Sequence, residues 1–183
     1  DTVLNLGLTD RAVAGLAAGT GNERFAWDAY RRLISMFGDV VMGVEYACFE
    51  RELDAVKRRE KVSEDTEISV AGLRDLCERF KGCFEDETGR GFPQEPLEQM
   101  ELAIEAVFGS WNKDSAVSYR RINGITGLLG TAVTVQAMVF GNMGDDSATG
   151  VAFTRNPSTG ENALYGEFLV NAQGEDVVAG IRT

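Results

Sequence analysis

The sequence predicts an α+β fold in which helices come first and strands follow. Apolar residues recur at three- and four-residue spacing from about residue 22 to residue 123, which is the pattern of amphipathic helices. After Gly127 and Gly130 the period changes to two, the alternation of β-strands. Helices followed by sequential strands are typical of the α+β class, so we expect a helical unit joined to an antiparallel sheet.

The first two helices have clear start signals. Thr9 and Asp10 can cap a short helix within the Gly- and Ala-rich lead-in of residues 1–21. Asn22 can cap a longer helix, which Gly38 is expected to stop.

The later helices are marked by periodicity and by Pro or polar starts. An amphipathic helix over residues 46–56 has a charged outer face, and a further helix begins near Ser69, with residues 82–93 expected as a loop. Pro96 suits the first turn of the next helix, and Asp114 is placed to cap a last short one. The aromatic residues of these stripes are expected in the core, not in a cofactor site.

The strand region is expected to form an antiparallel meander. The predicted strands are residues 131–140, 149–154 and 164–170, joined by turns and followed by a polar loop at residues 173–176.

Composition excludes several classes of function. The 183 residues carry a formal net charge of −11, which opposes binding to nucleic acid or to an anionic membrane. The chain has no His, so it has no imidazole base, phosphohistidine or histidine metal ligand. No apolar run approaches the ~20 residues of a membrane span.

The cysteines predict structural thiols. Cys48, Cys77 and Cys83 are odd in number and form no CxxC pair. We therefore expect an intracellular, reducing compartment, with neither a disulfide framework nor a zinc site. Because the chain starts at Asp1 without a leader, we also expect an excised piece of a larger protein.

Polar residues of the strand region are the candidate ligand contacts. Gln136 interrupts an apolar run, and the backbone through Met138 and Val139 would be free to pair with an adenine edge if this strand lines a pocket. A Met side chain suits packing against a purine. The alternative is that Gln136 faces solvent and Met138 fills the core.

Charged residues after the strands are further candidates. Arg155 lies in a turn that can aim its guanidinium at phosphate oxygens, or it can pair with Asp145 or Asp146 at the surface.

Three carboxylates complete the candidate set. Glu167, Glu175 and Asp176 can accept hydrogen bonds from ribose hydroxyls or approach magnesium, or they can simply be solvated. No P-loop or Rossmann fingerprint occurs.

Several strings of the sequence resemble one family. They include RFAWDAYRR at residues 24–32, GVAFTRNPSTG at residues 150–160 and YGEFLVNAQGED at residues 165–176, together with residues 1–7 and 130–142. The chain closely resembles pyruvate, phosphate dikinase over essentially its whole length.

The resemblance implies an ATP-grasp-like lobe with antiparallel strands and an inserted small helical subdomain. In these terms residues 1–21 are a lead-in from the phosphate-loop side of the nucleotide-binding domain. Residues 22–123 are the helical subdomain, and residues 124–183 are an incomplete α+β lobe.

The resemblance also implies the reaction. The family uses ATP, phosphate and magnesium to phosphorylate a histidine on another domain, releases AMP and diphosphate, and converts pyruvate to phosphoenolpyruvate. This chain has no His, and the resemblance places the catalytic residues and the Mg²⁺ ligands outside it. It further implies ATP and AMP as ligands, the remaining domains of the enzyme as partners, a homodimeric parent and an isolated chain that is inactive.

The residues that the resemblance carries over are few. Gln136 to Val139 match the adenine-side strand, and Glu167, Glu175 and Asp176 match the ribose or metal side. Arg155 either contacts phosphate or braces its turn. The family occurs in cytoplasm, chloroplast and glycosome.

Two alternative functions remain open. One is a phosphoenolpyruvate synthase-type phosphotransferase, and the other is a non-catalytic acidic interaction module.

Overall fold

The computed structural model describes residues 3–178, apart from the side chains of residues 175 and 178. The chain divides into two compact units, Asp1–Gln136 and Ala137–Thr183, which are described separately. The structure is rich in helix and contains a small two-stranded antiparallel sheet, so the prediction of mixed helix and antiparallel strand is confirmed.

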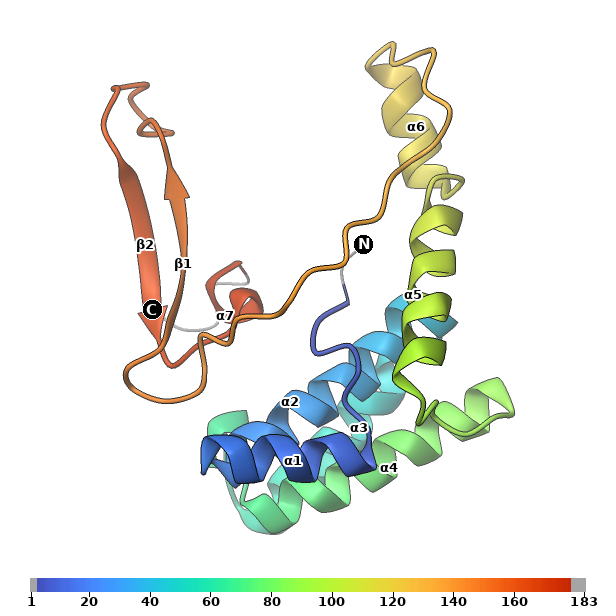
Figure 1. Ribbon diagram of the computed structural model, residues 1–183, viewed down its shortest axis with the longest axis vertical. Helices are drawn as coiled ribbons and strands as arrows, with labels where there is room; N and C mark the ends of the chain where they lie inside the picture. Colours follow the sequence, from blue (N-terminus) through green and yellow to red (C-terminus); the bar gives the residue numbers. More distant parts are fainter. Residues whose placement is uncertain (1–2, 179–183) are drawn as a thin grey trace. The chain divides into compact units, whose positions relative to one another are not determined.

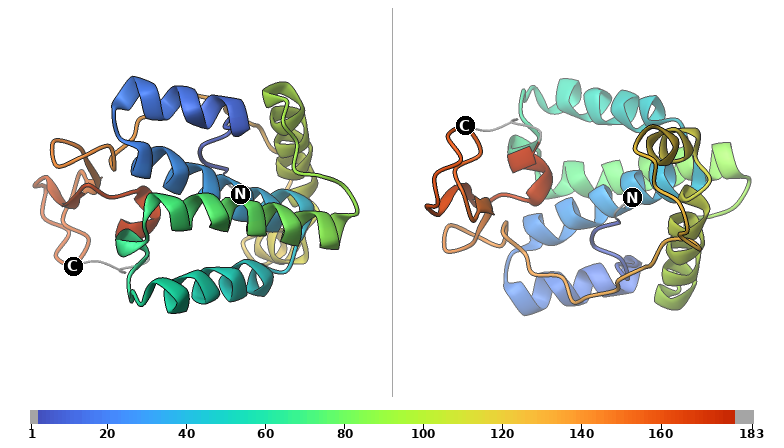
Figure 2. Two further views of the ribbon diagram at one scale, coloured as in Figure 1. Left: turned by 90° about the horizontal axis from the view of Figure 1, so that it is seen from below. Right: turned by 90° about the horizontal axis from the view of Figure 1, so that it is seen from above.

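The first unit is built of helices. They are α1 (Asp10–Thr20), α2 (Glu23–Met36), α3 (Tyr46–Glu60), α4 (Val70–Thr88), α5 (Pro96–Ser110) and α6 (Asp114–Ile122). Helices α1, α2, α4 and α3 lie side by side in that order, while α5 and α6 extend away from this layer (Figure 1 and Figure 2).

Side-chain caps start three of these helices where the sequence predicts. The Thr9 hydroxyl accepts from the Ala12 amide at 3.1 Å and starts α1. Asn22 accepts from Phe25 at 3.0 Å to start α2. Ser69 caps α4 in the same way, so these predictions are confirmed.

Two predicted helix ends are wrong. Gly38 does not stop its helix, because α2 continues into the π-helical turn η1 (Phe37–Val41). Gly38 is buried there, and a Cβ on it would lie 2.5 Å from the ring of Phe49. Likewise, residues 82–88 are helical and not a loop: Phe84 continues the buried stripe of α4, which ends at Gly89 with a φ of +70°.

The core of the first unit lies between the layered helices. Its largest fully buried apolar side chains are Tyr30, Phe37, Phe49, Phe80, Phe84, Leu33, Ile34, Ile68, Leu73 and Leu76. Phe92 packs edge-on against Phe37 and Phe84, with ring centroids 5.6 and 5.4 Å apart. The prediction that aromatic stripes form core is confirmed for these residues, whereas Phe108 and Tyr119 are exposed.

A partly buried ion-pair network lies beside this core. Asp28 and Arg31 of α2 pair at 2.8 Å, and Arg31 also reaches Asp65 at 2.9 Å. Asp65 begins the short 3₁₀ turn η2 (Asp65–Glu67) and also pairs with Lys57 of α3. The network therefore joins α2, α3 and the connection that precedes α4.

The expectation of three structural thiols is wrong for two of them. Cys48 and Cys83 form a disulfide between α3 and α4, across a sequence separation of 35 residues. Their side chains meet only because two helices distant in the sequence pack together, which no spacing rule could reveal. Cys77 is a buried free thiol, as predicted.

The second unit is a β-hairpin followed by a short helix. Strand β1 (Ala148–Phe153) pairs antiparallel with β2 (Tyr165–Val170), in a register from Ala148 opposite Val170 to Phe153 opposite Tyr165. Helix α7 (Gly174–Val178) follows and packs against β1.

The predicted three-stranded meander is therefore a two-stranded hairpin. Residues 131–140 alternate in sequence but have no regular secondary structure and are mostly exposed. A strand needs a hydrogen-bonded neighbour, and the sheet of the described residues contains only β1 and β2.

Candidate functional site

Three segments of the second unit meet where the hairpin opens. The Ala172 amide donates to the Gly141 carbonyl at 2.9 Å, and the Thr149 hydroxyl donates to the Ala172 carbonyl at 2.7 Å. The Asn171 amide also donates to Ser147 at 2.8 Å. We call the group Gly141, Asn142, Thr149, Ala172, Gln173 and Asp176 the hairpin base.

Gly141 allows this close approach. A Cβ at this position would overlap the Thr149 hydroxyl and would lie 2.6 Å from the Ala172 carbonyl oxygen. Any side chain would therefore force the three segments apart.

The hairpin base contains polar groups that lack partners. Gln173 is only 3% exposed, yet neither its Oε1 nor its Nε2 has a hydrogen-bond partner within the described part of the chain. The buried Oδ1 of Asn142 is in the same state. Leaving a buried polar group unpaired costs about 1–3 kcal/mol. These amides can donate and accept, as recognition of an adenine edge or a ribose hydroxyl requires.

Asp176 orients the start of α7 beside these amides. Its Oδ2 accepts from the Gln173 amide at 2.8 Å, and its side chain is buried. The structure thus brings the predicted residue Asp176 together with Gln173. The side chain of Glu175 lies outside the described residues.

The predicted adenine-side residues lie on the segment that leads into the hairpin base. Gln136 is exposed, Met138 is half-buried and Val139 is 90% exposed. Gly141, two residues after Val139, is the residue bonded to Ala172. Gln136 is the last residue of the first unit, whereas Met138 and Val139 belong to the second.

Arg155 lies at the opposite end of the hairpin. Its Nη1 donates to the Gly160 carbonyl at 3.2 Å, and Asn156 Oδ1 accepts from the Ser158 amide at 2.9 Å in the same turn. Arg155 therefore braces this turn. The tip is separated from the hairpin base by the length of the strands, roughly 17 Å at about 3.4 Å per residue.

Glu167 lies between these two ends. It is on β2 opposite Val151 and is exposed. The structure therefore separates Arg155 and Glu167 from the Gln173–Asp176 pair.

Sequence reasoning missed Gln173 and Asn142. The only available signal was polar side chains in a loop between apolar runs, which is also the pattern of a solvated turn. Their importance rests on burial without partners, and burial comes from the hydrogen bonds that join residues distant in sequence.

The first unit has a shallow apolar hollow at α6. Tyr119, Ile125 and Leu128 contribute to it, and its volume is about 360 Å³. Its charged residue, Arg120, stacks over the Trp111 ring at 3.7 Å and donates to the Trp111 carbonyl at 2.8 Å. The guanidinium is thus already engaged within the hollow.

The described residues, 3–178, hold neither a candidate metal cluster nor a candidate membrane-spanning helix. No cluster of three or more His, Cys, Asp or Glu side chains in this range is arranged to hold a metal ion. Over the same residues, no helix has the length and apolar character needed to cross a membrane.

Comparison with known proteins decides the family. Residues 1–183 match the family model described as Pyruvate phosphate dikinase, AMP/ATP-binding domain. The chain belongs to this family. Over all its residues it is 63% identical to Pyruvate, phosphate dikinase 1, chloroplastic, of Arabidopsis thaliana, and 59% identical to Pyruvate, phosphate dikinase, chloroplastic, of Mesembryanthemum crystallinum. It is 57% identical to Pyruvate, phosphate dikinase 2 of Zea mays.

The chain spans 19% of the length of the Arabidopsis and Mesembryanthemum relatives and 21% of the maize relative.

Proposed function

We propose that the chain is the ATP-binding portion of a pyruvate, phosphate dikinase. The observation that carries this proposal is the family match over residues 1–183, together with 57–63% identity to proteins of that name. The whole enzyme would use ATP, phosphate and pyruvate to form AMP, diphosphate and phosphoenolpyruvate through a phosphohistidine on another domain. Because the chain has no His, the phosphoryl group would be carried elsewhere.

The proposed architecture is part of an ATP-grasp domain. Residues 124–183 would belong to its antiparallel lobe, residues 22–123 would form an inserted helical subdomain, and residues 1–21 would lead in from the phosphate-loop side. Mg²⁺ would be held mainly by residues outside this chain. The parent would be a homodimer, and its similarity to chloroplastic relatives supports a location in chloroplast or cytoplasm.

Within the chain, we place adenine-side contacts at Gln136, Met138 and Val139. Glu167, Glu175 and Asp176 remain proposed contacts to ribose or magnesium, and Arg155 a proposed phosphate contact with four guanidinium N–H groups beyond the one that reaches Gly160. To these we add Gln173, which is buried with both side-chain polar atoms unpaired, and Asn142, whose Oδ1 is buried and unpaired within the described part of the chain.

A titration with AMP, and with ATP with and without Mg²⁺, tests the proposal. We expect amide and side-chain NH₂ resonances of Met138, Val139, Asn142 and Gln173 to shift. The isolated chain should bind weakly and show no turnover, since phosphoryl transfer needs electrostatic stabilisation that these residues do not supply. Saturating nucleotide without any shift in the second unit would contradict the proposed site.

The substitution Gln173→Leu sharpens this test. Leucine is apolar and similar in size, so the free chain should be as stable as before or more stable, because an unpaired buried amide is removed. Nucleotide affinity should fall roughly 10- to 100-fold, the equivalent of about 1–3 kcal/mol. Asn112→Leu, an exposed amide in the first unit, is the matched control and should change neither quantity.

A further inference from the structure

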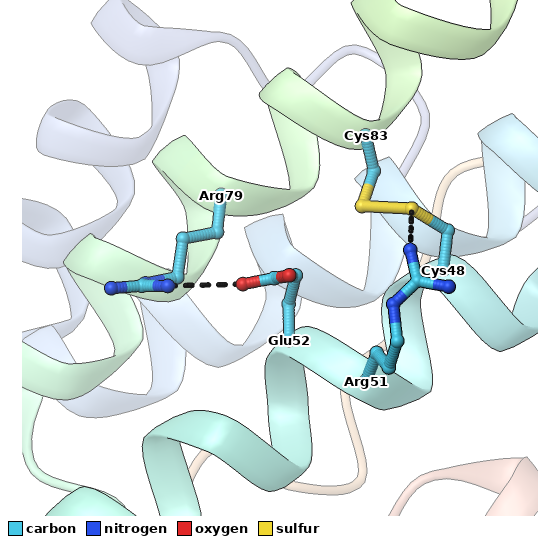
Figure 3. Close-up of a disulfide and its surroundings, with 5 residues drawn as sticks. All are labelled: Cys48, Arg51, Glu52, Arg79 and Cys83. Carbon is cyan, nitrogen blue, oxygen red and sulfur yellow. Dashed lines mark hydrogen bonds and ion pairs between the residues drawn. A yellow bond between two sulfur atoms is a disulfide. The ribbon is translucent and has the colours of Figure 1, made fainter.

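The disulfide between α3 and α4 ties down a helix at the edge of the layer. Cys48 lies in the first turn of α3 and Cys83 near the end of α4, with their Cα atoms 6.2 Å apart (Figure 3). In Figure 2, α3 lies at one edge of the layer and α1 at the other, and the main packing partner of α3 is α4. The bond therefore joins an edge helix of the layer to its main neighbour.

Non-covalent contacts hold the same two helices together. Phe49 and Phe80 pack edge-on with ring centroids 5.1 Å apart. Arg79 of α4 pairs with Glu52 of α3 at 3.0 Å, beside the disulfide (Figure 3). Because these contacts do not depend on the sulfur atoms, the helices can stay associated when the disulfide opens.

A cation lies next to one of the two sulfur atoms. The Arg51 Nη2 atom is 3.3 Å from Cys48 Sγ, and Arg51 itself is exposed (Figure 3). A neighbouring guanidinium stabilises a thiolate, and a stabilised thiolate is the better leaving group in thiol–disulfide exchange. Because Arg51 lies beside Cys48 Sγ, Cys48 is expected to be the better leaving group of the two cysteines.

The third cysteine, Cys77, is placed so that it cannot take part in thiol–disulfide exchange. Cys77 is fully buried on α4, and its thiol donates to the Trp27 carbonyl at 3.7 Å. Burial raises the pKa of the Cys77 thiol, which keeps it protonated and unreactive at neutral pH. Cys48 and Cys83 also belong to the core but keep 8% and 6% of their surface exposed, whereas Cys77 keeps none, so the exchange chemistry of the described residues is confined to Cys48 and Cys83.

We propose that Cys48–Cys83 is a thiol–disulfide exchange site for a protein dithiol of the thioredoxin type, and that its reduction loosens α3. The reductant thiolate attacks Cys83 Sγ, the Cys48–Cys83 bond breaks, and Cys48 leaves with the electron pair as a thiolate beside Arg51. The second thiol of the reductant then attacks the mixed disulfide and releases Cys83. Two electrons and two protons pass from the dithiol to the cysteines, and the reductant becomes a disulfide.

The test uses the complete polypeptide that contains this chain, with reduced thioredoxin as the probe. Differential alkylation and mass spectrometry follow Cys48, Cys77 and Cys83 separately, and hydrogen exchange follows the helices. We expect Cys48 and Cys83 to become alkylated together after reduction, while Cys77 stays unmodified until unfolding. Amide exchange should quicken in α3 and stay unchanged in α2.

Variants separate the exchange step from general destabilisation. Arg51→Gln should slow reduction roughly threefold to tenfold, because the Cys48 thiolate loses its cation. Arg58→Gln removes the same charge from an exposed position on the same helix and should leave the rate unchanged. Cys83→Ser cannot form the bond, so its exchange pattern should match that of the reduced protein.

Three results would overturn the proposal. The first is that Cys48 and Cys83 stay free thiols in protein treated with oxidised glutathione. The second is reduction at equal rates in the Arg51 and Arg58 variants. The third is α3 exchange that does not differ between the oxidised and reduced forms. None of these readouts depends on nucleotide binding, so their failure is distinguishable from failure of the proposed function.

Discussion

Asp28 and Arg31 form an ion pair inside the helical unit, with side chains 9% and 7% exposed. Asp28 also pairs with Arg32 at 3.1 Å, so one carboxylate serves two guanidinium groups. Burial raises the pKa of Asp28, but the charges of Arg31, Arg32 and Arg24 outweigh it and hold the pKa below its usual value. The buried carboxylate is therefore ionised at neutral pH because its partners remain charged.

Substitution of Asp28 measures this pairing. Asp28→Asn should lower the free energy of unfolding by about 3 kcal/mol, because it leaves Arg31 buried with less compensating charge. Chemical denaturation at pH 7 checks the value. Asp54→Asn removes an exposed carboxylate from α3 and should change stability by less than about 0.5 kcal/mol. Equal effects of the two substitutions would show that the buried pair contributes nothing beyond surface charge.

Gln99 is a buried residue whose hydrogen bonds are all made. Its Nε2 donates to the carbonyls of Leu8 and Pro93 at 2.9 and 2.8 Å, and its Oε1 accepts from the Gly7 amide at 2.8 Å. Gln99→Leu should therefore destabilise the chain by about 2–4 kcal/mol, since three backbone groups lose their partner. Thermal unfolding checks this expectation, and a gain in stability would contradict it. Gln173→Leu serves as the comparison, because the side-chain amide of Gln173 is buried without a hydrogen-bond partner within the described residues.

At the scale of elements, helix starts were predictable and some helix ends were not. Thr9, Asn22 and Ser69 each cap their helix through the residue three positions further on, so their caps are visible in the sequence. Gly38 and Gly82 looked like helix breakers, but both are helical residues. Gly38 packs against the ring of Phe49, whereas a Cβ on Gly82 would meet nothing within 4 Å. The local sequence does not distinguish these two environments.

Two glycine substitutions test this difference. Gly38→Ala should destabilise by about 1–3 kcal/mol, because the added carbon would lie 2.5 Å from the ring of Phe49. Gly82→Ala in α4 meets nothing within 4 Å and should stabilise by about 0.5–1 kcal/mol, through the lower entropy of the unfolded chain. Urea unfolding of both variants gives the two signs. Destabilisation of equal size would mean that crowding at Phe49 is not the cause.

In the candidate site, too, contacts between residues close in sequence could be predicted, whereas contacts between residues distant in sequence could not. Arg155 was expected to face phosphate, pair with an Asp or brace its turn, and the bond to Gly160 lies within five residues of it. The hairpin base depends on Gly141, Thr149 and Ala172, which are separated by a hairpin. Residues 131–140 alternate as a strand does, yet alternation cannot supply a neighbouring strand.

At the scale of the whole molecule, acid should destabilise the helical unit. Burial raises the pKa of Asp28 and of Asp65, but their cationic partners lower both pKa values below the usual range. A lowered folded-state pKa means that the unfolded state binds more protons in acid, so stability is complete above the unfolded pKa of about 3.9 and is lost as pH falls through the folded value.

This pH dependence is measurable from urea midpoints. The midpoint should be nearly constant between pH 7 and 5 and should fall steeply below about pH 4. Helical circular dichroism and Trp27 fluorescence report on the first unit. In Asp28→Asn the fall should be shallower, because one of the titrating carboxylates is gone. A midpoint that rises below pH 4 would reverse the sign of the linkage.

The glycine at the hairpin base also limits which sequences this fold can accept. Position 141 has no room for even one carbon beyond the backbone, while Gly144, three residues later, would meet nothing nearer than 3.4 Å. A library that randomises both positions and selects for a folded second unit should return glycine at 141 and a mixture of residues at 144. Mutations that accumulate around Asn142 and Gln173 must therefore be compatible with glycine at position 141, a neighbour that has no side chain.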